Sequence, residues 1–267
     1  MERKDCAILI NTCPEYFYIL ETHLTLLRRY GPNLKWPVYL ATENPNDFII
    51  RKLKNAFNIN IISLDNEQSD FFESRIAAIN ALPPDIKYVL PIQDDFLIER
   101  PGPNISALNN ALEILDNDRD VLSIRLMPCP GSSAKEAYSG IWNKLLPEDL
   151  QFSYQATIWR RDVYHVYMVR LIQQRIQFYP DMERSKYNHY AININPAETH
   201  PGLQLLKLMY PMGFHLCWPS VGTWANAVYQ CPWPYRPTAI VQGTLQDWAV
   251  ELAQREGLKL ARGPSLR

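Results

Sequence analysis

Residues 88–102, YVLPIQDDFLIERPG, place two adjacent carboxylates between apolar segments. The apolar run 88–92 leads into Gln93, Asp94 and Asp95, and apolar residues follow at once. Neighbouring carboxylates repel each other and lose solvation when they are buried, so a folded chain keeps them there only with compensation. A bound cation is the obvious compensation.

Strand and helix patterns alternate on both sides of this stretch, from residue 6 to about residue 126. The pattern predicts strands over 6–12, 37–42, 59–64, 87–92 and 121–126. It predicts helices over 16–31, 47–58, 69–84 and 107–118. Such alternation is typical of a parallel sheet with crossover helices, in which ligands bind beyond the carboxyl ends of the strands. The acidic pair follows the fourth strand, so we expect it in the binding crevice.

The alternation of strand and helix patterns ends at about residue 126. We expect an irregular loop over 127–150, a strand leading into a helix over 152–176, and a final amphipathic helix over 244–258. Aromatic residues and prolines concentrate in the segment 179–237. The sequence therefore predicts one continuous α/β domain, with a mostly parallel sheet flanked by helices and an irregular, aromatic-rich C-terminal region.

Composition narrows the class of protein. The 267 residues are 47% hydrophobic, which is ample for a core, and 27 Lys and Arg against 28 Asp and Glu leave a formal charge of -1. A charge near zero argues against nucleic acid as a partner.

Five cysteines without a CxxC pair argue against a disulfide scaffold or a zinc module. No apolar run approaches about 18 residues, so we expect a soluble, cytoplasmic protein without a transmembrane segment. Peripheral membrane association and the oligomeric state stay open.

Two adjacent carboxylates are hard oxygen ligands of the kind that Mg²⁺ or Mn²⁺ prefers. Both ions usually keep several waters and are completed by substrate phosphates, so one or two carboxylates suffice. The alternative is that Asp94 and Asp95 begin a surface turn. Their position at the end of a buried strand favours the metal site.

Four segments together carry a family resemblance: NTCPEYF (11–17), LATEN (40–44), SRIAAINAL (74–82) and YVLPIQDDFLI (88–98). They resemble the nucleotide-sugar-binding half of GT-A-type glycosyltransferases, in particular viral and bacterial sugar transferases with a variant DxD motif. The resemblance covers about residues 6–126 and implies a GT-A-like, Rossmann-type sheet. It also implies a nucleotide-sugar-binding half over 1–126 and an acceptor-binding half over 127–267.

In this resemblance, Gln93, Asp94 and Asp95 form an acidic motif that lacks the first acid. Asp95 matches the last acid and Asp94 the middle one. The motif implies a Mn²⁺ or Mg²⁺ cofactor on the diphosphate of a sugar nucleotide.

The resemblance also implies roles for three residues around the motif. It places Thr12 beneath the nucleobase or ribose, Glu43 beside the nucleoside, and Arg75 near the diphosphate or the sugar. Each has a plainer interpretation, since Thr12 can cap a turn, Glu43 can be solvated, and Arg75 can form a surface ion pair.

An inverting sugar transfer needs a carboxylate base that deprotonates the acceptor hydroxyl. Asp181 and Glu183, in the segment YPDMERSK (179–186), are the candidates. The segment loosely resembles an acidic motif of some bacterial and viral sugar transferases, although the usual tryptophan is absent. The alternative for both residues is a charged surface turn.

Gln155 and Trp159 are candidates for lining the sugar site, because amides bind hydroxyls and indoles cover pyranose faces. Core packing is the alternative for Trp159. His200 and His215 are weaker candidates for completing a metal site, since no ligand spacing connects them.

The sequence thus predicts a metal-dependent glycosyltransferase for glycan biosynthesis. It would move a sugar from a nucleoside diphosphate donor, UDP-sugar before GDP-sugar, to a carbohydrate acceptor with inversion. One alternative is another metal-assisted nucleotide or phosphate enzyme, although the chain has no GxGxxG or GxxxxGK[ST] loop. The other is a noncatalytic carbohydrate-binding protein, which leaves the acidic pair unexplained.

Overall fold

The computed structural model describes residues 3–64, 71–128, 131–132, 137–147, 149–150, 152–182, 201–219, 228–236, 238–241 and 243–260; for 201–203 only the backbone is described. Its centre is a nine-stranded sheet in the order β3-β2-β1-β4-β9-β6-β10-β8-β7. The first strands are β1 (Cys6–Asn11), β2 (Val38–Thr42), β3 (Asn60–Ser63), β4 (Tyr88–Gln93) and β6 (Val121–Arg125). The others are β7 (Ala137–Ser139), β8 (Trp142–Lys144), β9 (Thr157–Arg160) and β10 (Phe214–Cys217).

Most of the sheet is parallel. β1 pairs in parallel with β2 and β4, β2 with β3, and β6 with β10, whereas β9 lies antiparallel between β4 and β6. This arrangement confirms the predicted α/β class with a mostly parallel sheet. β9 and β10 come from beyond residue 126, so both predicted halves contribute to one sheet; their division into donor and acceptor halves stays a prediction.

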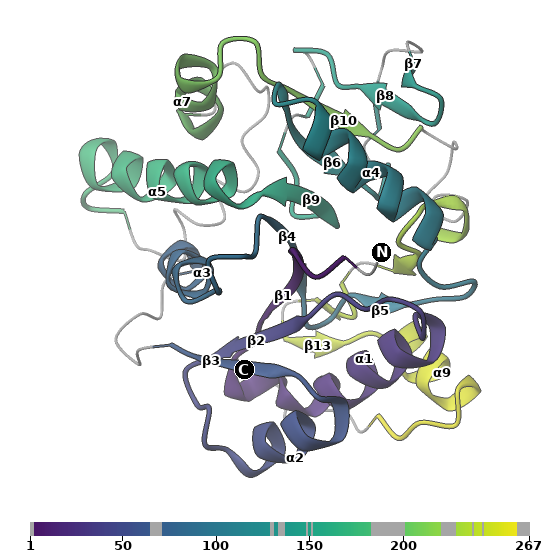
Figure 1. Cartoon of the computed structure of the whole chain (residues 1–267). Coiled ribbons are helices and arrows are strands. Elements are labelled where there is room, and N and C mark those ends of the chain that lie inside the picture. Colours follow the sequence, from purple (N-terminus) through teal and green to yellow (C-terminus); the bar gives the residue numbers. More distant parts are fainter. Residues whose placement is uncertain are drawn as a thin grey trace.

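Helices cover both faces of the sheet (Figure 1). They are α1 (Phe17–Tyr30), α2 (Phe48–Phe57), α3 (Phe71–Asn80), α4 (Ile105–Asn117), α5 (Arg161–Phe178), α7 (Pro201–Met209) and α9 (Asp247–Arg255). Side chains alternate along a strand, so Ile8 and Ile10 of β1 enter the core beneath α1, α2 and α4, while Ala7 and Leu9 enter the core beneath α3 and α5. α3 therefore lies over the face that Asn11, two residues after Leu9, continues.

The long elements lie close to their predicted ranges, but several short ones were not predicted. The segment 127–150, expected as an irregular loop, contains β7 and β8. The sequence also gave no indication of β5 (Leu97–Ile98), β10 or α7. The unpredicted strands have two to four residues and show too few apolar repeats to be recognised by periodicity, a reason that does not extend to α7 with its nine residues.

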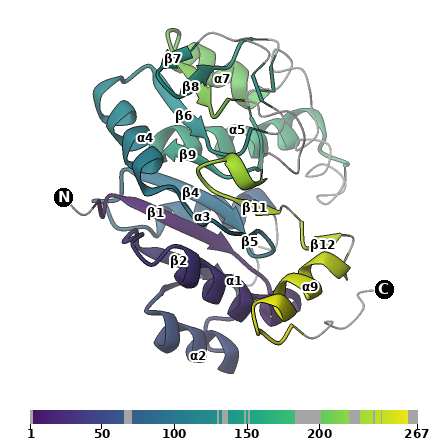
Figure 2. The same ribbon diagram turned by 90° about the vertical axis from the view of Figure 1, so that its right-hand side faces the viewer.

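The C-terminal segment returns to the segment that follows the acidic pair. β11 (Tyr235–Arg236) pairs antiparallel with β5, and the Glu99 amide donates to the Pro234 carbonyl at 2.8 Å. A small hairpin of β12 (Ile240–Val241) and β13 (Thr244–Leu245) follows, and α9 then lies beside α1 (Figure 2). The first and last parts of the described chain are thereby joined.

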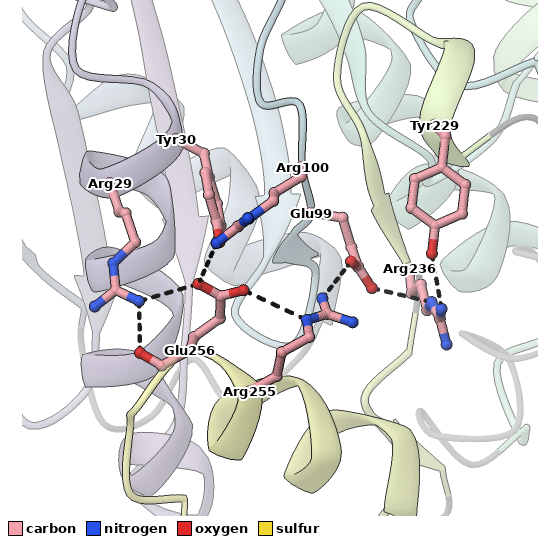
Figure 3. Close-up of polar contacts among 8 residues, drawn as sticks. All are labelled: Arg29, Tyr30, Glu99, Arg100, Tyr229, Arg236, Arg255 and Glu256. Atoms are coloured by element: carbon pink, nitrogen blue, oxygen red, sulfur yellow. Dashed lines mark hydrogen bonds and ion pairs between the residues drawn. The ribbon is translucent and has the colours of Figure 1, made fainter.

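Two buried glutamates fix α9 in this position (Figure 3). The side chains of Glu99 and Glu256 are each 2% exposed. Arg255 lies between them, with Nη2 2.9 Å from Glu99 Oε2 and Nε 3.4 Å from Glu256 Oε1. Arg29 of α1 contacts Glu256 at 3.1 Å, and Arg236 of β11 contacts Glu99 at 3.0 Å. The network thus connects α1, β11 and α9.

Within the described residues, no helix is both long enough and apolar enough to cross a membrane. Cys6, Cys13, Cys217 and Cys231 are free thiols, and Cys129 lies outside the described residues. The cytoplasmic location expected from the sequence stays a prediction.

We expect Glu256→Gln to lower the free energy of unfolding by about 1–3 kcal/mol, because the substitution removes a buried charge from several arginines. The arginines are partly exposed and can be resolvated, which limits the loss. The matched control is Glu21→Gln, which breaks an exposed pair with Lys52 and should cost about 0.5 kcal/mol or less. Urea unfolding followed by circular dichroism measures both, and equal losses would contradict the structural role of the network.

Candidate functional site

The acidic pair occupies a tight turn at the carboxyl end of β4. The Phe96 amide donates to the Gln93 carbonyl at 3.2 Å, which makes Gln93–Phe96 a β-turn with Asp94 and Asp95 at its centre. Their exposures are 6% and 7%, so the acids are buried and the surface-turn alternative does not hold. Asp95 has a negative φ, which excludes a type II turn.

Asp94 is held from two sides. The Thr12 hydroxyl donates to Asp94 Oδ2 at 2.7 Å, and His23 Nδ1 lies 3.0 Å from the Asp94 carbonyl oxygen. Burial raises the pKa of Asp94 to about 7, and the neighbouring charge of Asp95 adds to the rise. Thr12 therefore stabilises the ionised carboxylate directly, instead of only capping a turn.

Asp95 binds the C-terminal hairpin. Its Oδ2 accepts from the Ile240 amide at 3.1 Å, and its carbonyl accepts from the Ala239 amide at 3.2 Å. Burial raises the pKa of Asp95 to about 6, against the effect of the Ile240 hydrogen bond. Sequence reasoning missed this contact because 145 residues separate its partners.

Arg75 is buried at the middle of α3, with 5% exposure, so it is not the surface ion pair of the plainer interpretation. Nη2 donates to Gln93 Oε1 at 3.0 Å and Nη1 to the Phe71 carbonyl at 2.9 Å. The guanidinium lies 3.3 Å from the centre of the Phe71 ring, a cation–π contact. Burial lowers the pKa of Arg75, but an arginine stays charged in proteins. A fixed positive charge therefore lies beside the acidic turn.

A pocket of about 290 Å³ opens between these groups. Of the predicted site residues it brings together Thr12, Glu43, Arg75, Gln93 and Asp94. Lining residues that the sequence reasoning missed are Asn11, Cys13, Tyr16, Leu64, Phe71 and Ser74. The pocket lies at the carboxyl ends of β1, β2 and β4, where an open α/β sheet binds its ligands.

Two buried polar atoms in this pocket have no hydrogen-bond partner among the described residues. They are Asn11 Nδ2, at the end of β1, and Glu43 Oε2, just after β2. A buried polar group without a partner costs about 1–3 kcal/mol. Both residues line the pocket, so a polar ligand bound there would lie next to these side chains. The signal for Asn11 was its place beside Thr12 at the strand end.

The carboxylate oxygens of the acidic turn are ligands of the type that a hard divalent cation prefers. In the described part of the chain neither carboxylate forms an ion pair with lysine or arginine, although burial disfavours their charges. No set of three or more His, Cys, Asp and Glu side chains gathers there into a metal cluster. The turn therefore supplies an incomplete site, which suits ions that keep waters and take ligand phosphates.

The predicted base residues lie elsewhere. Asp181 is exposed in the turn after α5, and it is not among the residues that line the pocket. Glu183 and His200 lie outside the described residues. The role of Asp181 and Glu183 stays a prediction.

Trp159 and Gln155 lie behind Arg75. Trp159 is 1% exposed and packs against aromatic side chains such as Phe152, with ring centres 5.6 Å apart. Gln155 Oε1 accepts from the Tyr235 hydroxyl at 2.5 Å. The cavity that they line is about 10 Å³, room for about one water and not for a sugar ring. The geometry favours the packing alternative for Trp159, and it gives no support to either residue as a sugar contact.

His215 is a core residue. It lies on β10, which is separated from β4 by β9 and β6, and its Nδ1 is 2.7 Å from Ser123 Oγ. Burial lowers its pKa to about 3, so the ring is neutral. It is not part of the acidic turn.

No family model matches this sequence, and no curated protein matches it. Solved structures do align with the fold. TarS 1-349 from S. aureus aligns at a TM-score of 0.37 and 18% identity, over 60% of this chain and 48% of that one. The mannosyltransferase PcManGT from Pyrobaculum calidifontis, in complex with GDP-Man and Mn²⁺, aligns at 0.41 and 14%, over 64% and 53%.

A protein of another activity aligns equally well. The 4-diphosphocytidyl-2C-methyl-D-erythritol synthase from Anaerococcus prevotii has a TM-score of 0.37 and 11% identity, over 70% of this chain and 82% of that one. This chain spans about half the length of TarS 1-349 and of PcManGT. TM-scores this low support no inference about activity, so the function must be inferred from the acidic turn and its pocket.

We expect Asp94→Asn to stabilise the metal-free protein at pH 8. The raised pKa means that the folded state holds this proton more tightly than the unfolded chain, so the contribution of Asp94 to stability falls from about pH 4 to about pH 7. The variant should exceed the wild type by about 1–3 kcal/mol at pH 8 and lose this advantage near pH 4.

Urea unfolding in a chelator across this pH range measures the difference. Asp181→Asn, at an exposed carboxylate, is the control for removing one negative charge. A difference between Asp94→Asn and wild type that stays constant with pH would contradict the burial of an ionised Asp94.

Proposed function

We propose that this chain is a metal-dependent glycosyltransferase that moves a sugar from a nucleoside diphosphate sugar to a carbohydrate acceptor, with inversion. One observation carries the proposal: the buried acid Asp94 and the buried cation Arg75 line one pocket at the end of β4, and the buried Asp95 follows Asp94 in the same turn. A metal-bound diphosphate offers both charges, a cation to the acids and an anion to the arginine.

In this proposal Arg75 binds the diphosphate. Phe71 and Gln93 fix the guanidinium from two sides, so little side-chain entropy remains to be lost on binding. The Tyr164 hydroxyl also hydrogen-bonds the guanidinium, and arginine has five N–H donors, more than these three contacts require, so donors remain for phosphate oxygens. The buried setting strengthens the attraction.

In this proposal Asn11 and Glu43 form hydrogen bonds with the nucleoside. The unpaired Glu43 oxygen can accept from an N–H or O–H group, and Asn11 Nδ2 can donate to a carbonyl or hydroxyl. Tyr16 and Phe71 provide aromatic walls in the same pocket. These groups do not choose between bases, and UDP-sugar before GDP-sugar remains the prediction from sequence.

Asp94 and Asp95 would hold Mn²⁺ or Mg²⁺. When bound, such an ion supplies positive charge that stabilises a departing diphosphate. Thr12 and the Ile240 amide each hold the Oδ2 atom of one carboxylate, so the two acids are oriented before any ligand arrives.

The acceptor side is inferred from sequence alone. We propose that Asp181 or Glu183 deprotonates the acceptor hydroxyl. Asp181 is exposed and therefore accessible to an acceptor. The noncatalytic alternative leaves the buried acids unexplained, and a different nucleotide enzyme would use the same pocket, so ligand binding must be followed by a transfer assay.

We expect one of UDP, GDP, dTDP and CMP to raise the melting temperature only with Mn²⁺, because a ligand that binds the native state stabilises it by about 2.7 kcal/mol at a hundredfold excess over Kd. Asp94→Asn and Asp95→Asn should abolish the shift. Differential scanning fluorimetry measures it, with Asp181→Asn as the matched carboxylate control that keeps it. A shift that ignores both Mn²⁺ and the acids would overturn the metal-dependent function.

We expect Asp181→Asn or Glu183→Gln to keep nucleotide binding and to lower the turnover number by about 10²–10⁴-fold, since a general base acts in the transition state. The assay measures release of the nucleotide from the corresponding sugar nucleotide, chosen by the melting shift, in the presence of a panel of acceptors. If each single variant and the double variant turn over like the wild type, neither residue is the base.

A further inference from the structure

His23 of α1 contacts the acidic turn from inside the core. It is fully buried, and its Nδ1 lies 3.0 Å from the Asp94 carbonyl oxygen. A carbonyl only accepts hydrogen bonds, so Nδ1 must carry the proton and donate. Burial lowers the pKa of His23 to about 4, so the ring is neutral near pH 7 and Nε2 bears a lone pair. Nε2 has no partner among the described residues.

An apolar residue would suit this position better if packing were its only role. The buried neighbours on the same helix include Leu20 and Leu27, one turn before and after, and the adjacent Leu24. An unpaired nitrogen in such surroundings costs free energy, and leucine would avoid that cost. The benefit of histidine must therefore come from its other nitrogen, the donor to Asp94.

The accepting carbonyl occupies a decisive place in the turn. It belongs to the peptide between Asp94 and Asp95, the central peptide of the turn Gln93–Phe96. Turn types I and II differ by a flip of this central peptide. A flip would change the backbone angles from which both carboxylates project, so a donor on this carbonyl controls the direction of both acids.

We infer that His23 is a positioning residue for the metal: its Nδ1–H holds the central peptide of the acidic turn so that Asp94 and Asp95 present their carboxylates together to a divalent cation. This inference rests on the proposed function. The other contacts of the turn hold side-chain oxygens or the Asp95 carbonyl, so His23 acts on a group that Thr12 and Ile240 leave untouched.

The test compares His23→Leu, which removes the donor, with His23→Asn, whose side-chain amide can place an N–H close to the position of Nδ1. Calorimetric titration measures the affinity for Mn²⁺ and for the nucleotide diphosphate, the latter with and without Mn²⁺. We expect His23→Leu to weaken Mn²⁺ binding about 10–100-fold, the usual effect of losing a group that orients a metal ligand. At saturating Mn²⁺ the nucleotide affinity should stay within about threefold of wild type, and His23→Asn should recover most of the Mn²⁺ affinity.

The outcomes separate two failures. If the wild type binds neither Mn²⁺ nor any nucleotide, the proposed function fails and this inference with it. If the wild type binds both and folded His23→Leu binds Mn²⁺ equally well, only the positioning role is overturned. Should His23→Leu not fold, His23→Gln, whose amide reaches toward the Nε2 position, replaces it. Mn²⁺ affinity in His23→Asn no better than in His23→Gln then rejects the inference.

Discussion

The burial of two adjacent carboxylates in one turn is the constraint on which the site depends. Each group of the turn is held by a different part of the chain: Thr12 from β1, His23 from α1, and the Ala239–Ile240 segment from the C-terminal hairpin. Hydrogen bonds to the ionised form offset part of the burial cost but not all of it, since the pKa values of both acids stay raised. The C-terminal hairpin therefore contributes directly to the hydrogen bonding of the turn.

Contacts outside the acidic turn hold the C-terminal segment in place. β11 pairs with β5, and Arg255 joins the buried Glu99 to Glu256, so the hairpin is fixed on both sides of its contact with Asp95. Thr238, next to that contact, has a φ of 61°, which is unfavourable for a β-branched residue. Pairing on either side offsets this strain and keeps the Ile240 amide at the carboxylate. The contacts that stabilise the C-terminal hairpin thus help to position the Asp95 carboxylate at the end of β4.

Local sequence predicted the parts of this arrangement that local physics determines. The apolar run 88–92 and the acids after it indicated a buried strand with a polar end, and the topology of parallel sheets then placed Asp94 at the crevice. The grouping of Thr12, Glu43 and Arg75 followed from the family resemblance, and the structure places them around one pocket. Their roles remain proposals.

The contacts that complete the turn were beyond the reach of sequence patterns. β12 has two residues, too few for a period, and its contact with Asp95 spans most of the chain. His23 falls on the buried face of an amphipathic helix, where any residue is first interpreted as core. Trp159 was ambiguous for the same reason, because a buried indole and a sugar platform look alike in sequence. Long-range hydrogen bonds, and not periodicity, distinguish these cases.

Several groups around the pocket are buried at a cost in free energy, and a ligand of suitable charge would offset that cost. Burial disfavours the charged forms of Asp94 and Arg75, and Asn11 and Glu43 each have one buried polar atom without a partner among the described residues. A cation alone would satisfy the acids and increase the positive charge near Arg75. A phosphate alone would satisfy Arg75 and repel the acids. A metal–diphosphate carries both signs in one ligand, so the ligand that we propose would suit the acids and Arg75 together.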